Sequence, residues 1–237
     1  MPKEPENLDL YDEHEEVVSE GGKKVKRRGI FLLPNLLTTT SLFAGFFSII
    51  SSIEGDFIYA GMAIFIAQIF DGLDGRVARL AKAESKFGEQ YDSLCDVISF
   101  GLAPAICIFL WGLSSLDQIG WVFSFLFLAA AALRLARFNS NIGSEDTFFR
   151  GLPSPVAAGL IAYYVWYLSS LGVEGEYVGA TLAVVSACIT GLAAILMVIN
   201  VPYYSFKEIE MKRRVPFFSI LMVVFIFALV SLDPPLV

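Results

Sequence analysis

The sequence predicts an all-α fold, a polytopic bundle of helices that cross a membrane. Of the 237 residues, 56% are hydrophobic and 17% are charged, and the mean hydropathy is +0.64. The apolar residues come in long runs rather than in alternation with polar ones, which is typical of membrane-spanning helices. A chain of this length has room for about seven spans and little else, so we expect no separate soluble domain.

Seven apolar runs, each close to the ~20 residues that a bilayer helix needs, mark the expected spans. They cover residues 33–53, 57–78, 88–112, 118–138, 152–171, 178–199 and 215–232. The last run is also compatible with a helix that lies in the membrane interface. We therefore divide the chain into an acidic, then basic cytoplasmic segment, residues 1–28, and a membrane-embedded domain, residues 29–237.

The basic residues indicate how these spans are oriented. With the N-terminus in the cytoplasm, all 17 lysines and arginines fall on the cytoplasmic side, and the outer connections hold none. This asymmetry follows the positive-inside rule. We therefore expect an integral protein of the cell membrane with its basic side in the cytoplasm. The basic, then apolar segment at residues 23–33 fits either a plain positive flank of the first span or an interfacial helix that binds anionic headgroups.

Acidic residues crowd the first twenty positions, and we expect this head to be disordered or frayed. The three cysteines all lie in apolar runs, which predicts packing residues rather than disulfides. His14 is the single histidine, so a Ser-His-Asp triad or a histidine-rich zinc site is excluded. Acid–base chemistry must therefore come from carboxylates, Lys, Tyr or Cys.

Four aspartates stand at the cytoplasmic ends of the second and third spans: Asp71, Asp74, Asp92 and Asp96. A charged side chain in a bilayer helix costs about 3 kcal/mol on insertion scales, so four together need a reason. Spacings of three and four residues place each pair on one helix face. Because consecutive spans are antiparallel, all four carboxylates can converge.

Carboxylates this close repel one another unless cations or protons lie between them. Sites built from carboxylates and substrate phosphate are the usual home of Mg²⁺ or Mn²⁺. Two such ions would suit displacement at phosphorus, because they stabilise the attacking and leaving oxygens. The alternative is that the four carboxylates are merely solvated at helix ends.

Small residues accompany the aspartates: Gly72, Gly75, Ala78 and Gly88. They fit either close helix packing or the approach of a phosphate to the backbone. Arg79, one turn beyond Gly75, is suited to a diphosphate or to anchoring the inner face of the membrane.

The pattern Asp71-x2-Asp74-Gly75-x2-Ala78-Arg79-x8-Gly88-x3-Asp92-x3-Asp96 resembles the signature of the CDP-alcohol phosphatidyltransferase family at all eight positions. The resemblance implies a six-helix core, to which the last apolar run adds a seventh span. It also implies that Asp71, Asp74 and Asp92 bind two divalent metals, and that Asp96 touches metal and acts as base on the acceptor hydroxyl. The CDP site would be formed by Asp74, Gly75, Ala78, Arg79 and Gly88.

The first span opens with Leu33-Pro34-Asn35-Leu36-Leu37-Thr38, which resembles the PN-x-x-T start of these enzymes. By this resemblance, Asn35 and Thr38 would face the nucleotide. A capped helix start is the structural alternative.

Two further stretches resemble the phosphatidylserine synthase subgroup: RLARFN at 134–139 and GLPSP at 151–155. Arg134 and Arg137 share a helix face, and with Arg150 they are candidates to bind a serine carboxylate or a lipid phosphate. Positive-inside anchoring is the alternative for these arginines.

The resemblance implies transfer of the phosphatidyl group of CDP-diacylglycerol to serine, giving phosphatidylserine and CMP. We expect direct displacement, because no nucleophile beside a base is evident. Another acceptor, such as inositol phosphate or glycerol phosphate, and an ether-lipid donor stay open. A divalent-cation transporter is a remote alternative, since the Asp cluster has no second copy. The expected partners are CDP-diacylglycerol, serine, membrane lipids and a second copy of the chain in a homodimer, but no nucleic acid.

Overall fold

The computed structural model describes residues 16–20, 23–27, 32–81, 86–140, 149–173, 178–199 and 202–203. Almost all of this part is helical, which confirms the all-α fold. The helices are α1 (Leu32–Glu54), α2 (Phe57–Ala81), α3 (Lys86–Asp96), α4 (Ala103–Trp111), α5 (Gln118–Ser140), α6 (Ser154–Ser170) and α7 (Ala180–Val198). A π-helical segment, η1 (Val97–Leu102), joins α3 to α4, and a 3₁₀ turn, η2 (Leu113–Leu116), follows α4.

Two pairs of short antiparallel strands accompany the helices. They are β1 (Glu16–Glu20) with β2 (Lys23–Arg27), and β3 (Phe149–Arg150) with β4 (Pro202–Tyr203). The expected disorder of the head is wrong for residues 16–20. Their register sets Glu16 opposite Arg27 and Glu20 opposite Lys23.

Within the described residues, five helical segments are long and apolar enough to cross a membrane, namely residues 33–54, 57–80, 87–111, 118–140 and 180–198. They match five expected spans within a few residues, and the protein is an integral membrane protein. The span expected at 152–171 is the shorter helix α6 of 17 residues, at the lower limit of the ~17–25 residues that span a bilayer. The span expected at 215–232 lies outside the described residues.

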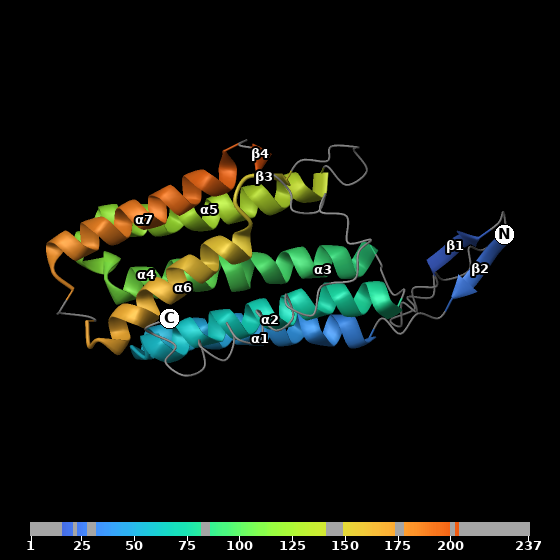
Figure 1. Cartoon of the computed structure of the whole chain (residues 1–237), viewed down its shortest axis with the longest axis horizontal. Helices are drawn as coiled ribbons and strands as arrows, with labels where there is room; N and C mark the ends of the chain where they lie inside the picture. Colours follow the sequence, from blue (N-terminus) through green and yellow to red (C-terminus); the bar gives the residue numbers. More distant parts are fainter. Residues whose placement is uncertain are drawn as a thin grey trace, which may run out of the picture.

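The helices run along the long axis of the molecule (Figure 1). Helix α1 packs along α2, and α5 packs along α7. The continuous segment α3–η1–α4 lies between these pairs, and α6 packs on α2 and α4. Because α2 ends where α3 begins, the C-terminal end of α2 and the N-terminal end of α3 lie at the same end of the bundle (Figure 1).

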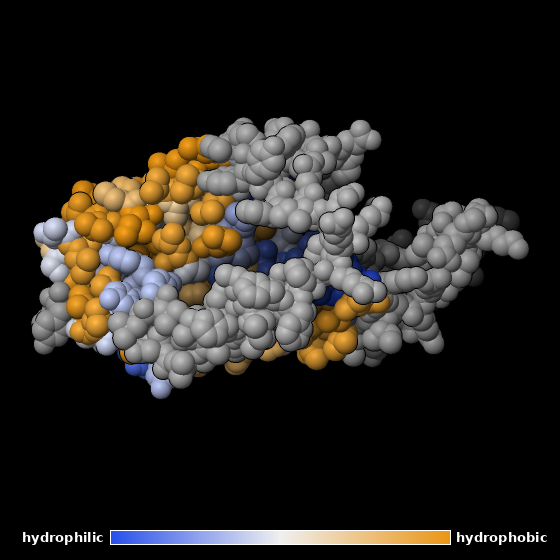
Figure 2. All heavy atoms as spheres, viewed as in Figure 1, coloured by the Kyte–Doolittle hydropathy of each residue, from blue (hydrophilic) through white to orange (hydrophobic). Residues whose placement is uncertain are grey.

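The core has two buried parts. One joins α4 to α6 and α5 around Trp111, Phe127 and Ile161, and the other joins α1, α2 and η1 around Ile64 and Phe100. Large apolar side chains also lie on the outside, which suits a surface facing lipid. Figure 2 shows apolar residues over the left part of the visible face, and hydrophilic residues toward the end where α2 meets α3.

Small side chains let α1 approach the π-helical segment closely. A Cβ added to Gly45 would lie 2.6 Å from the hydroxyl oxygen of Ser99. The Ser99 hydroxyl donates to the carbonyl of Ser41 at 3.2 Å, and the Ser41 hydroxyl donates to the carbonyl of Ala67 at 3.0 Å. These contacts fix α1 against α2 and against the wide π-helical turn that directly follows Asp96, a kind of turn that often marks functional sites.

Candidate functional site

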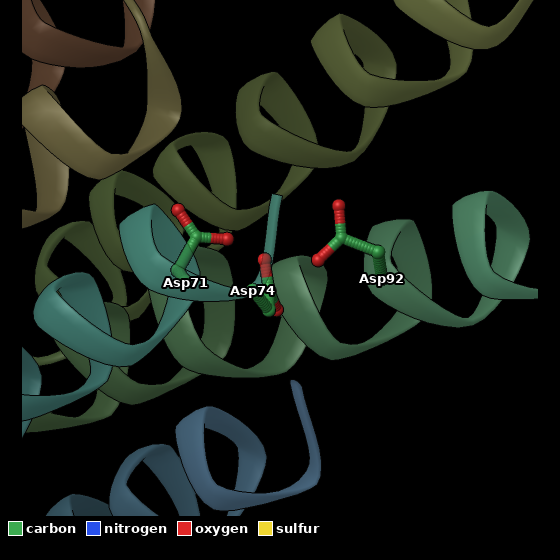
Figure 3. A group of neighbouring side chains, drawn as sticks. All are labelled: Asp71, Asp74 and Asp92. Atoms are coloured by element: carbon green, nitrogen blue, oxygen red, sulfur yellow. The ribbon is translucent and has the colours of Figure 1, made fainter. Parts of the chain in front are cut away.

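Three aspartates converge where α2 meets α3. Helix α2 contributes Asp71 and Asp74 and α3 contributes Asp92, and their carboxylates point into one space (Figure 3). One oxygen of each lies within 4.8 Å of the others. The convergence expected from the spacing is therefore present in the structure.

Asp96 reaches the same cluster from one turn further along α3. Its side chain is hydrogen-bonded to that of Asp71. Two carboxyl groups can approach this closely only when a proton or a cation lies between them. All four aspartates of the motif thus meet at one end of the bundle.

The cluster fits a divalent metal. Its donors are carboxylate oxygens, which Mg²⁺ and Mn²⁺ prefer. In addition, Oδ1 of Asp92 is buried and accepts no hydrogen bond from the described part of the chain. A buried carboxylate oxygen without a donor is costly, and a bound cation would remove that cost.

Asp74 is held from the neighbouring helix. The hydroxyl of Thr38 in α1 donates to Oδ2 of Asp74 over 2.6 Å, and the two residues are only 4% and 3% exposed. Asn35, one turn earlier in α1, is partly exposed, and its carbonyl accepts a hydrogen bond from Thr39 at 2.7 Å. Of the two residues expected at the nucleotide, Thr38 therefore contacts the aspartate cluster directly.

The residues expected to form the CDP site lie on an open part of α2 and α3. Gly75 and Arg79 are exposed, while Ala78 and Gly88 are partly exposed. A Cβ added to Gly75, or to Gly72, would meet nothing within 4 Å. Close helix packing therefore does not explain these two glycines, and the backbone beside the cluster is accessible.

Arg134, one of the three candidate arginines, lies within reach of the cluster. It interacts electrostatically with Asp96, and its Nη1 donates to the hydroxyl of Ser154 at 3.1 Å. Its buried Nε has no hydrogen-bond partner among the residues that the structure describes. One N–H of this guanidinium is therefore available to an anion beside Asp96.

The other two candidate arginines differ from Arg134. Nη1 of Arg137 donates to the carbonyl of Val198, the last residue of α7, at 3.2 Å, so Arg137 ties α5 to the end of α7. Arg150 is described only through its backbone, which pairs with Pro202 between β3 and β4. Its side chain lies outside what the structure describes.

Three polar residues that the sequence reasoning passed over connect the motifs. Nε2 of Gln68 donates to the carbonyl of Pro155 at 2.6 Å, the Ser93 hydroxyl donates to Oδ1 of Asn139 at 3.2 Å, and Ser154 accepts from Arg134. Gln68 could have been recognised in the sequence, because it is an amide inside an apolar span and lies three residues before Asp71, on the same helix face. Ser93 and Ser154 could not have been recognised in this way, since serine is common in membrane helices.

Comparison with known proteins places these features in context. The model of the CDP-alcohol phosphatidyltransferase family matches residues 31–202. The chain is 37% identical to a Helicobacter pylori CDP-diacylglycerol–serine O-phosphatidyltransferase, over 78% of this chain and 77% of that protein. It is 36% identical to the Mycobacterium bovis protein of the same name, over 70% of this chain and 73% of the relative. An archaetidylserine synthase from Methanothermobacter thermautotrophicus is 36% identical, over 65% of this chain and 67% of that protein.

Proposed function

The chain belongs to the CDP-alcohol phosphatidyltransferase family, and from this premise we propose that it transfers the phosphatidyl group of CDP-diacylglycerol to L-serine, giving phosphatidylserine and CMP. The observation that carries the proposal is the convergence of Asp71, Asp74 and Asp92, with Asp96 bonded to the cluster. The names of the relatives support serine as the acceptor.

In this proposal the four aspartates would hold two divalent ions, either Mg²⁺ or Mn²⁺. The ions would supply positive charge opposite the diphosphate of the donor. Thr38 keeps Asp74 oriented toward the cluster. The exposed Gly75 lets the diphosphate approach the backbone of α2, and Arg79 one turn later offers a guanidinium to it. Asn35, Ala78 and Gly88 complete the proposed CDP site.

Asp96 is the proposed base. It accepts the proton of the serine hydroxyl, and the serine oxygen forms a bond to the lipid-linked phosphorus. The bond between that phosphorus and the oxygen of CMP breaks, and CMP leaves with the electron pair. Asp96 suits this task because it lies deepest along α3 in the cluster, next to Arg134. Orientation and electrostatic stabilisation carry most of the rate in such transfers.

Arg134 is the proposed anchor for the serine carboxylate. Its buried Nε has no partner among the described residues, and its guanidinium interacts electrostatically with Asp96. In this proposal, a serine whose carboxylate binds Nε places its hydroxyl near the base. Arg137 supports this region by fixing the end of α7, and Arg150 stays a candidate for the carboxylate or for a lipid phosphate. An arginine fork matches a carboxylate better than a lysine does.

The orientation in the membrane follows from the charges. We propose that the aspartate end of the bundle faces the cytoplasm, because all 17 basic residues fall on that side of the expected topology. Serine then enters from the cytoplasm, and the lipid chains of the donor lie among the helices. The homodimer stays a prediction, which the mass of the protein in detergent would test.

An acceptor panel tests the function. The purified protein is given CDP-diacylglycerol with Mg²⁺ or Mn²⁺, and CMP release is measured with serine, inositol phosphate and glycerol phosphate. We expect serine to be preferred and phosphatidylserine to be found by mass spectrometry. Reaction with inositol phosphate or glycerol phosphate but not with serine would refute the acceptor. A parallel series with an ether-linked donor tests whether the chain uses an ether lipid instead, an alternative suggested by its similarity to the archaetidylserine synthase.

A further inference from the structure

Thr38 lies where α1 touches the aspartate cluster, and its hydroxyl faces a carboxylate rather than open space. We infer that Thr38 is a positioning residue that orients Asp74 for metal binding, and not a contact to the nucleotide. The inference rests on the proposed metal site. It adds Thr38, a residue of α1, to a site whose aspartates come from α2 and α3.

The hydrogen bond between the two side chains has the geometry of a strong one. Its length is 2.6 Å, which falls in the 2.5–2.7 Å range of hydroxyl–carboxylate bonds, and both residues are buried. The carbonyl of Pro34 lies 3.1 Å from the same hydroxyl and is a neutral, more distant acceptor. The single hydroxyl proton of Thr38 is therefore directed at Asp74.

The bond restricts how Asp74 can turn. With Oδ2 held by Thr38, rotation of the Asp74 carboxylate is limited. Donors behind metal-binding carboxylates act in this way, by fixing the ligand before the metal arrives.

Helix α1 is a rigid support for this donor. The Ser41 hydroxyl ties α1 to the carbonyl of Ala67 in α2 at 3.0 Å, and the Thr39 hydroxyl lies 2.9 Å from the hydroxyl of Tyr91 in α3. These contacts do not involve Thr38. Loss of the Thr38 hydroxyl should therefore leave α1 in place and change only the restraint on Asp74.

Neighbouring threonines provide the control. Residues 38–40 are all threonine, and successive positions of a helix are turned by about 100°. The hydroxyl of Thr40 donates to the carbonyl of Leu36 in its own helix at 2.8 Å. Thr40→Val thus removes the same group from the same helix without touching Asp74.

The test measures Mn²⁺ binding to the purified protein by electron paramagnetic resonance in the absence of substrate. We expect Thr38→Val to weaken Mn²⁺ binding about tenfold or more, as is typical for loss of a group behind a metal ligand. Thr38→Ser, which keeps the hydroxyl, and Thr40→Val should bind Mn²⁺ like the wild type. If Thr38→Val does not fold, Thr38→Ala, which adds no atoms, should weaken Mn²⁺ binding to the same extent.

CDP affinity at saturating Mn²⁺ is the second readout. Unchanged Mn²⁺ binding by Thr38→Val, together with weaker CDP binding at saturating metal, would overturn the inference and assign Thr38 to the nucleotide. Absence of Mn²⁺ binding by the wild type would instead overturn the proposed metal site, and this inference with it. The two failures are therefore distinguishable.

Discussion

Arg134 of α5 donates a hydrogen bond from Nη1 to the hydroxyl of Ser154, the first residue of α6, over 3.1 Å. Ser154 is fully buried, so water does not compete for its hydroxyl. The bond joins the RLARFN stretch to the GLPSP stretch, and Nε of Arg134 has no partner in the part of the chain that the structure describes. The two stretches thus act together to orient one guanidinium beside Asp96.

Ser154→Ala should weaken the use of serine. A hydrogen bond to a charged group contributes about 1.5–3 kcal/mol, so we expect kcat/KM for serine to fall about tenfold or more. KM for CDP-diacylglycerol should stay unchanged, because the donor is held elsewhere. Ser170→Ala is a matched control, since that hydroxyl bonds only within α6, to the carbonyl of Tyr167 at 2.7 Å. Equal kcat/KM for serine in the Ser154 variant and the wild type would contradict the proposed anchor.

Asp96→Asn should abolish transfer and keep donor binding measurable. The amide can still donate to Asp71, so the packing of the cluster is preserved. Loss of the base alone should reduce turnover by about 10² to 10⁴-fold. Asp71→Asn should differ, because weaker metal binding would weaken donor binding as well. Nucleotide affinity and turnover are measured for both at saturating metal, and near-normal turnover by Asp96→Asn would place the base elsewhere.

Removal of divalent metal should stop the reaction. Carboxylates that repel one another cannot hold a diphosphate without cations between them. Protein treated with EDTA should therefore release no CMP, and Mg²⁺ or Mn²⁺ should restore release. Ca²⁺, which prefers more ligands at longer distances, serves as a comparison. Full activity after removal of all divalent metal would refute the metal site.

Alanine substitutions at Gly75 and Gly45 should affect different properties of the protein. A Cβ at Gly75 meets nothing within 4 Å, so Gly75→Ala should unfold at the temperature of the wild type but bind CDP-diacylglycerol more weakly. A Cβ at Gly45 would lie 2.7 Å from Cα of Ser99, and overpacking of this kind costs about 1–3 kcal/mol. Gly45→Ala should therefore lower the midpoint of thermal unfolding in detergent. Normal donor binding by Gly75→Ala would show that the open backbone there is not used.

Much of the fold and of the site was predictable from the sequence. Hydropathy alone located five of the seven expected spans, because a bilayer requires about 20 apolar residues in each and satisfies no backbone groups outside a helix. The spacing of Asp71 and Asp74, and of Asp92 and Asp96, placed each pair on one helix face, and a short antiparallel connection brought the faces together. Locating the spans and bringing the four aspartates together depend only on local geometry and on the order of the helices.

The contacts between distant helices were decided by the tertiary structure. Thr38 and Asp74 are 36 residues apart, and Arg134 bonds to Ser154 across a connection that includes residues 141–148. Whether such side chains meet depends on how far each helix is rotated and where the helices cross, and apolar runs do not encode these quantities. The π-helical turn after Asp96 was likewise invisible in the sequence, because its residues are as apolar as those of an ordinary helix. The sequence by itself thus determined which carboxylates gather, and the packing of the helices decided which donors hold them.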